Sequence, residues 1–126
     1  MSFETDFRNH LVADASITAL GNSRVFPVTL PEQVTFPAIG YTVIGGAPEN
    51  SLLGFDSELT RYDLQIDCWA NRYTGVIALG LAIRNRLQTD AATFRSIVDQ
   101  YPLLDDYEED TKIYRRAIGI VCWFRG

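Results

Sequence analysis

The sequence is poor in the residues from which most catalytic and metal sites are built. It has one histidine, His10, and two cysteines, Cys68 and Cys122, among 126 residues. A Ser-His-Asp or Cys-His arrangement would have to use His10, which lies at helical spacing from Phe3 and Phe7 and is expected to pack, partly buried, beside them. The cysteines lie far apart in apolar, strand-like segments, so we expect buried thiols without a disulfide. A zinc site would need mainly carboxylates, which are not its usual ligands, and we predict no metal, no cofactor and no enzymatic activity.

Long apolar runs and an excess of basic charge are also missing. The longest apolar run, residues 76–83, is far shorter than the roughly 20 residues that a membrane-spanning helix needs. The first residues carry acids instead of a basic stretch before an apolar segment, so we expect no secretory signal and folding in a cytoplasm. The net charge of −5 disfavours nucleic-acid binding as a main activity, because that affinity comes mostly from neutralising phosphates.

Apolar residues, by contrast, are plentiful enough for one packed core. They make up 47% of the chain, while Gly and Pro are scattered without a linker-like stretch. A chain of this length has the usual size of one domain, and division into two would leave neither with enough interior. We therefore predict a single domain over residues 1–126.

The hydrophobic periodicity changes along the chain from helix to strand and back. Residues 60–69 give the clearest strand, because apolar and polar side chains alternate strictly there. The pattern predicts helices at 3–13, 16–20 and from Asn71 or Thr74 to 88, strands at 24–28, 36–44, 60–69, 94–101 and 112–124, and loops at 45–57 and 102–110. This order predicts an α+β fold: a mostly antiparallel sheet with an N-terminal helix and one long central helix packed on one face.

The central helix is apolar on more than one side. One sheet face of a small chain can cover only part of such a helix, so a second subunit is the simplest cover for the rest. Val76 and Gly80 are the candidate contact residues, and the small residues Ala78, Gly80 and Ala82 would allow a neighbouring backbone to approach closely. Burial under the N-terminal helix of the same chain explains the pattern equally well.

Two loop segments stand out for their side chains. Leu52, Leu53 and Phe55 are large apolar residues in a predicted loop, where they either meet a partner surface or fold onto their own domain. The densest charge run is predicted to be a solvated acidic loop, because it lacks the alternating ligands and central glycine of a calcium-binding loop. Its acids are Asp105, Asp106, Glu108, Glu109 and Asp110.

Asp63 and Asp67 are the carboxylates whose spacing is worth testing for acid–base chemistry. Four residues along one strand place them roughly 13 Å apart, which exceeds the separations of about 5 to 9.5 Å used by glycosidases. We expect a polar strand face on which these acids pair across the sheet with Arg61, Arg115 or Arg116.

Several segments, taken in their order along the chain, resemble one protein family. They are Gly21 with RVFP at 24–27, FPAI at 36–39, RYDLQIDCWA at 61–70, AIR at 82–84 with Leu87, and YRR at 114–116. In this order they resemble the tail completion proteins of long-tailed bacteriophages. The resemblance spans nearly the whole chain, and its motifs are those that determine the fold.

The resemblance implies a tail terminator, a structural virion protein that caps the head-proximal end of the tail tube and joins the tail to the head. Such proteins act as rings, typically of six subunits, so the implied partners are further copies of the chain, the tail tube protein and the head connector or head completion protein. DNA would pass through the ring without specific binding, and assembly would take place in the host cytoplasm. A related neck or minor tail component of similar fold is the alternative, followed by a small ligand-binding or regulatory domain.

Overall fold

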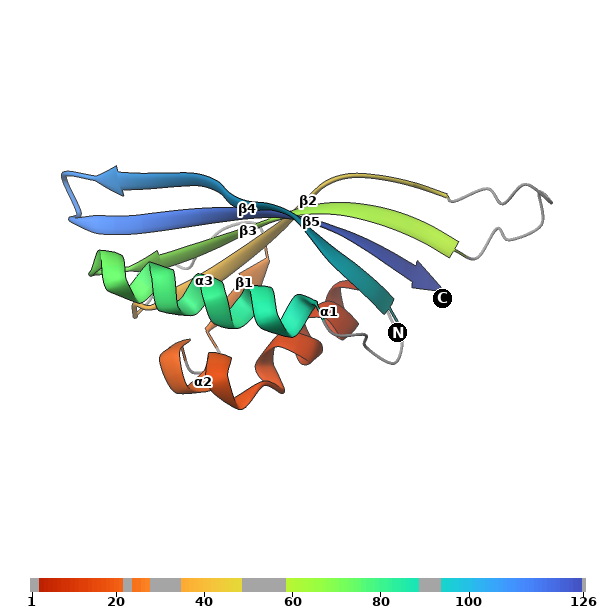
Figure 1. Cartoon of the computed structure of the whole chain (residues 1–126), viewed down its shortest axis with the longest axis horizontal. Coiled ribbons are helices and arrows are strands. Elements are labelled where there is room, and N and C mark those ends of the chain that lie inside the picture. The colour runs from red at the N-terminus through yellow and green to blue at the C-terminus, as the bar shows by residue number, and fades with distance from the viewer. Residues whose placement is uncertain (1–2, 22–23, 28–34, 49–58, 89–93, 126) are drawn as a thin grey trace.

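A computed structural model describes residues 3–21, 24–27, 35–48, 59–88 and 94–125, and these ranges form one sheet with helices on one of its faces (Figure 1). The helices are α1 (Phe3–Val12), α2 (Ala15–Gly21) and α3 (Tyr73–Leu87), and the strands are β1 (Val25–Pro27), β2 (Ala38–Pro48), β3 (Leu59–Ala70), β4 (Phe94–Glu108) and β5 (Ile113–Arg125).

The five strands of the described residues lie in the order β1-β2-β3-β5-β4. Only the short β1 runs parallel to its neighbour, whereas the other three pairings are antiparallel. Figure 1 shows the strong twist that is usual for such sheets. The prediction of a mixed helix and strand fold with an N-terminal helix is confirmed, as is the position of the proline-containing β1 at an edge.

The core lies between the sheet and the helices. On β3 the apolar residues of the alternating pattern face the helices, and Leu64 and Ile66 are 0% exposed. They lie opposite Ile120 and Ile118 of β5, so the two central strands place paired apolar side chains on one face. Full burial of such a side chain contributes roughly 1.5–3 kcal/mol, which explains why strict alternation in the sequence determines which face points inward.

Helix α1 closes one end of this core with aromatic residues. Phe3 stacks on Tyr62 with ring centroids 4.2 Å apart and meets Phe124 edge-on. Phe7 is 0% exposed and lies 5.5 Å from the ring of Tyr41 on β2. The helical spacing of the N-terminal aromatics therefore attaches α1 to three different strands.

Strand β4 differs most from the prediction. A loop was expected at 102–110, yet β4 continues to Glu108, and the turn covers only 109–112, where Lys112 has a φ of 57°. Asp105 and Asp106 lie opposite Arg116 and Arg115 in the sheet. These cross-strand pairs offset the mutual repulsion of the acids, which is the reason the segment forms a strand.

Two further boundaries also differ from the prediction. Strand β2 runs through Pro48 with a register shift before Gly45, so residues 45–48 are strand and not loop. Helix α3 begins at Tyr73 after Arg72, whose extended backbone forms the N-cap without a side-chain hydrogen bond. Neither Asn71 nor Thr74 is therefore the cap.

Candidate functional site

Arg116 is the charged residue around which one end of the fold is organised. It projects from β5 on the helix side of the sheet and is only 9% exposed. Its Nε donates to Oδ1 of Asp105 at 2.8 Å, and its Nη2 donates to Oδ2 of the same carboxylate at 3.0 Å. Such a bidentate pair is strong because both partners are charged. Hydrogen bonding to Arg116 lowers the pKa of Asp105, and the same bonds raise the pKa of Arg116.

Two tyrosines and a glycine complete this network beneath α3. Arg116 also donates to the hydroxyls of Tyr101, at 3.2 Å, and Tyr73, at 3.3 Å, and the Tyr73 hydroxyl donates to Asp105 at 2.8 Å. A Cβ atom at position 80 would lie 3.1 Å from Cδ of Arg116 and 3.3 Å from the hydroxyl oxygen of Tyr101. The glycine therefore allows α3 to approach the network closely, and the network attaches α3 to the β4–β5 hairpin.

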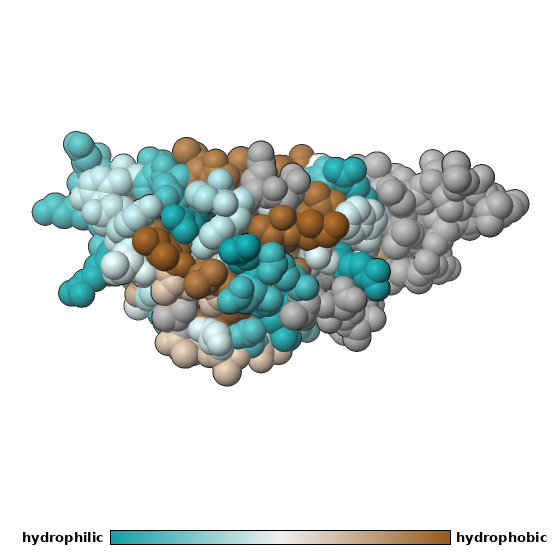
Figure 2. Space-filling model, in the orientation of Figure 1, coloured by the Kyte–Doolittle hydropathy of each residue, from teal (hydrophilic) through white to brown (hydrophobic). Residues whose placement is uncertain are grey.

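One flank of α3 carries an exposed apolar row. Tyr73, Ile77 and Leu81, the α3 stripe, are 42%, 38% and 44% exposed and follow one another at intervals of four residues. In Figure 2 apolar residues lie among hydrophilic ones across the region that α3 crosses in Figure 1. Exposed apolar residues gathered in this way are typical of interaction surfaces.

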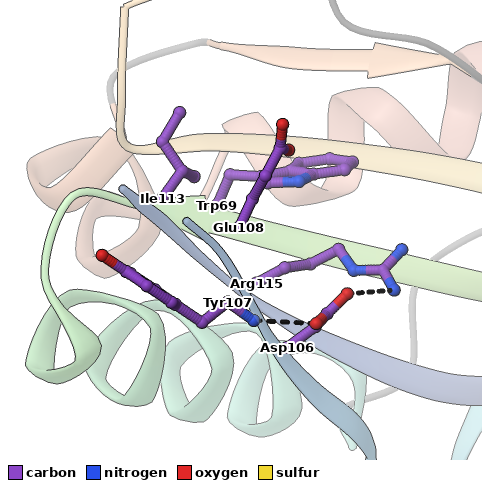
Figure 3. Close-up of a pocket in the computed structure, with 6 residues that line it drawn as sticks. All are labelled: Trp69, Asp106, Tyr107, Glu108, Ile113 and Arg115. Carbon is purple, nitrogen blue, oxygen red and sulfur yellow. Dashed lines mark hydrogen bonds and ion pairs between the residues drawn. The ribbon is translucent and has the colours of Figure 1, made fainter. Parts of the chain in front are cut away.

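The sheet face opposite the helices is hollowed near the β4–β5 turn. A hollow of about 230 Å³ is bordered by Trp69 and Ile113, and Glu108 stands beside Trp69 (Figure 3). Asp106, which also lines the hollow, accepts hydrogen bonds from the backbone N–H of Tyr107 at 2.8 Å and from the guanidinium of Arg115 at 3.4 Å. The Asp106 carboxylate and the Arg115 guanidinium neutralise each other. The hollow therefore offers its shape, together with the charge of Glu108.

Further apolar residues are exposed on this face or at its edge. Ile44 is 62% exposed, Ile97 is 53% exposed and Leu104 is 50% exposed. A second hollow of about 230 Å³ lies between Ile44 and Leu103, above Gly119. Both faces of the protein thus present uncovered apolar side chains.

Comparison with known proteins identifies the family. The sequence model of the family described as Tail completion protein gp17 matches residues 5–125 of this chain. The chain belongs to this tail completion family. It is therefore a structural component of a phage-type virion tail. Among curated proteins no match was found.

A solved structure supports the fold of this tail completion protein. A chain from the virion of a native gene transfer agent particle superposes with a TM-score of 0.72 at 15% sequence identity. The match covers 99% of this chain and 96% of the other. The fold is thus shared, over nearly the whole of both chains, with a chain of a gene transfer agent particle.

The tail completion protein buries two of its predicted interface residues within its own fold. Val76 is 0% exposed, and Gly80 is buried against Arg116 and Tyr101. Neither is accessible to a second subunit, which corrects that prediction, because the sheet and the chain's own helices cover this side of α3. The exposed large apolar residues of the helix are those of the α3 stripe. The predicted loop contacts Leu52, Leu53 and Phe55 lie outside the described residues.

The predicted acidic cluster is divided by the structure into two parts. Arg116 and Arg115 bind Asp105 and Asp106, as described above, within the sheet. The remaining acids, Glu108, Glu109 and Asp110, form the acidic tip: all three are exposed, and none has an ion pair with a described residue. Only the tip retains the solvated character that the sequence predicted for the whole run.

The other polar predictions concern the open sheet face and α1. Asp67 pairs across the sheet with Arg115 at 3.7 Å, as expected, whereas Asp63 pairs with Arg61 of its own strand at 3.0 Å. His10 is partly buried, also as expected, and its Nε2 lies 3.3 Å from the carbonyl oxygen of Arg86 on α3. Burial and the nearby Arg86 lower the pKa of His10.

No group of three or more His, Cys, Asp and Glu side chains in the described ranges is arranged to hold a metal ion. No helix in the part of the chain that the structure describes is long and apolar enough to cross a membrane.

The inward position of Arg116 could have been found from the alternation of side chains along β5. Arg116 lies an even number of residues from Ile118, Ile120 and Cys122, which face the core, so it points to the same side. A guanidinium on an inward face requires an anionic partner, and the acids of the neighbouring segment were the available ones. Assigning those acids to a loop concealed the pairing.

Proposed function

We propose that this tail completion protein forms a ring at the head-proximal end of the tail tube, where it caps the tube and joins the tail to the head connector. The observation that carries the proposal is the family match over residues 5–125, which covers the described fold except the first two residues of α1. The similarity to a chain of a gene transfer agent particle supports the same fold. A ring of six copies is the expected assembly.

The exposed apolar surfaces fit a protein that works between partners. A capping ring needs lateral contacts between copies, a surface for the tube protein and a surface for the head connector or head completion protein. The α3 stripe and the open sheet face present apolar side chains in two directions, which an isolated chain leaves in water. Residues 52–55 are proposed to contact the tube, because Leu52, Leu53 and Phe55 are apolar.

The charge of the chain fits passage of DNA without specific binding. With a net charge of −5, copies of this protein offer few cations to neutralise phosphates. Tight phosphate contacts would have to be broken as DNA leaves the head, so weak attraction favours ejection. The protein is thus proposed to surround DNA and not to hold it.

Purified tail tubes provide the test of the capping role. The protein is mixed with tubes of the corresponding phage, and bound rings are located by negative-stain imaging. The proposal predicts density at one tube end and tails of normal length that join heads. Binding along the tube wall, or at the end distant from the head, would indicate another tail component of similar fold.

The triple variant Leu52→Ser, Leu53→Ser and Phe55→Ser tests the docking segment. It is expected to form rings that no longer bind tube ends. Tails that terminate at normal length and join heads in the presence of this variant would show that the segment is not a docking surface.

A further inference from the structure

Charges without partners remain at two places of the described structure. The first is the acidic tip, whose Glu108, Glu109 and Asp110 project around the β4–β5 turn. This turn lies at one end of the elongated sheet in Figure 1, and the corresponding end is hydrophilic in Figure 2. Because Arg115 and Arg116 are occupied by Asp106 and Asp105, the tip has only Lys112 beside it as a cation in the turn.

The second place is a groove with basic residues, named here the basic groove. It has a volume of about 260 Å³ and is lined by Phe36, Pro37 and Ala70, with Arg72 at its margin. Arg24 adjoins it, because its Nε donates to the carbonyl oxygen of Pro37 at 2.9 Å. Neither arginine forms an ion pair with a described carboxylate. The groove thus combines apolar walls with two available cations.

The register of the sheet places tip and groove at the same end but on different pairs of strands. Ala70, which lines the groove, lies opposite Tyr114 of β5, and Tyr114 lies opposite Tyr107 of β4, next to the tip. In the strand order, however, the tip joins β4 and β5, while Pro37 precedes β2 on the side of β1. Two different, complementary patches on one chain produce head-to-tail contacts between copies, which close into a ring when the rotation permits.

We propose that the acidic tip of one copy docks in the basic groove of the next copy. This inference rests on the proposed ring and identifies its lateral contact. Three carboxylates then meet Arg24 and Arg72, and the apolar walls of the groove cover the stems of the acidic side chains. The contact is electrostatic at a partly exposed site, so it weakens with salt as the Debye length falls from about 10 Å at 0.1 M to about 3 Å at 1 M.

Charge reversal on each side tests this contact. The tip variant carries Glu109→Lys and Asp110→Lys, and the groove variant carries Arg24→Glu and Arg72→Glu. Each variant alone places like charges at every contact, so the protein concentration needed for half-assembly is expected to rise at least tenfold. In an equimolar mixture, the reversed tip meets the reversed groove and the native tip meets the native groove. The mixture is therefore expected to assemble as alternating rings.

Control variants place a charge of the same sign elsewhere on the surface. Asn9→Lys on α1 and Asn85→Glu near the end of α3 introduce one lysine and one glutamate at exposed positions away from tip and groove. Both controls are expected to assemble like the unmodified protein, and all variants should unfold at a similar temperature. Assembly is measured by light scattering in solution and by occupancy of purified tube ends.

The outcomes distinguish this contact from the ring itself. Failure of each variant alone with recovery in the mixture supports the contact. Rings formed equally well by both variants would overturn it and leave the ring intact. Variants that fail alone and also fail together, or a tip variant that forms rings but no longer binds tubes, would overturn it as well and assign the charges to another partner. If the unmodified protein neither assembles nor binds tubes, the proposed function itself fails.

Discussion

Replacing Arg116 with alanine removes the donor of four hydrogen bonds from a residue that is only 9% exposed. The Asp105 carboxylate keeps its bond from the Tyr73 hydroxyl but loses its charged partner. Breaking a fully buried ion pair costs about 3–5 kcal/mol. Because the Asp105 side chain is 30% exposed, water replaces part of the interaction, and we expect a loss of about 2–3 kcal/mol. For a domain of this size the midpoint of thermal unfolding should fall by roughly 6–15 °C.

Arg115 provides the matched control for this prediction. It is the preceding residue, has the same side chain and forms ion pairs with Asp67 and Asp106 at 3.7 and 3.4 Å, but it lies on the open face of the sheet. Arg115→Ala is expected to cost about 1 kcal/mol, because Arg115 is 28% exposed and its buried partner Asp67 keeps the hydrogen bond from Gln65. Calorimetry or thermal circular dichroism measures both variants. Equal losses for the two variants would refute the argument that burial makes Arg116 the stronger determinant.

The pH dependence of the Arg116 effect is an additional check. The pKa of Asp105 is lowered in the folded state, so its contribution to stability is complete above its unfolded pKa, near 3.9, and is lost as the pH falls through the folded value. The difference in stability between the unmodified protein and Arg116→Ala should therefore shrink in strong acid. A double variant with Arg116→Met and Asp105→Asn should lose less stability than the sum of the two single changes, because neither charge is left unpaired.

The remaining predictions concern His10, the start of α2 and the cysteines. The pKa of His10 is lowered in the folded state, so the unfolded chain binds the proton first as the pH falls. The free energy of unfolding is therefore expected to be complete above about pH 6.5 and to fall below it. Denaturant titration at pH 7.5 and 5.5 measures this, and the difference between the two values should be smaller for His10→Gln. Asp14 accepts from the backbone N–H groups of Ser16 at 2.8 Å and Ile17 at 3.3 Å, so Asp14→Ala should cost about 1 kcal/mol and Asp14→Asn much less; an equal loss for both would argue against capping. Both thiols are buried, and burial raises the pKa of Cys122 to about 12. Neither cysteine should therefore react with a thiol reagent at pH 8 until the protein unfolds. Rapid labelling of the native protein would contradict this prediction.

The predictable parts of the fold are those where one physical effect dominates. Tyr62, Leu64 and Ile66 alternate with polar residues, so burial of one face determined both the strand and its orientation. The aromatics of α1 were equally clear, because helical spacing places Phe3 and Phe7 on one side.

The parts that escaped prediction depend on partners distant in sequence. Asp105 forms part of a strand because Arg116 lies opposite it, which the local run of acids could not reveal. Gly80 was interpreted as a contact for a neighbouring subunit, whereas it makes space for Arg116 and Tyr101 of the same chain. The pattern of α3 showed that it needed cover on several sides and left open which element supplied it.

Native mass in the absence and presence of tail tubes tests the proposed capping role most directly. Light scattering over a concentration series, followed by imaging of tube ends, should show a ring of about six copies that binds one end of the tube. A protein that stays monomeric at every concentration and leaves the tube ends bare would contradict the account.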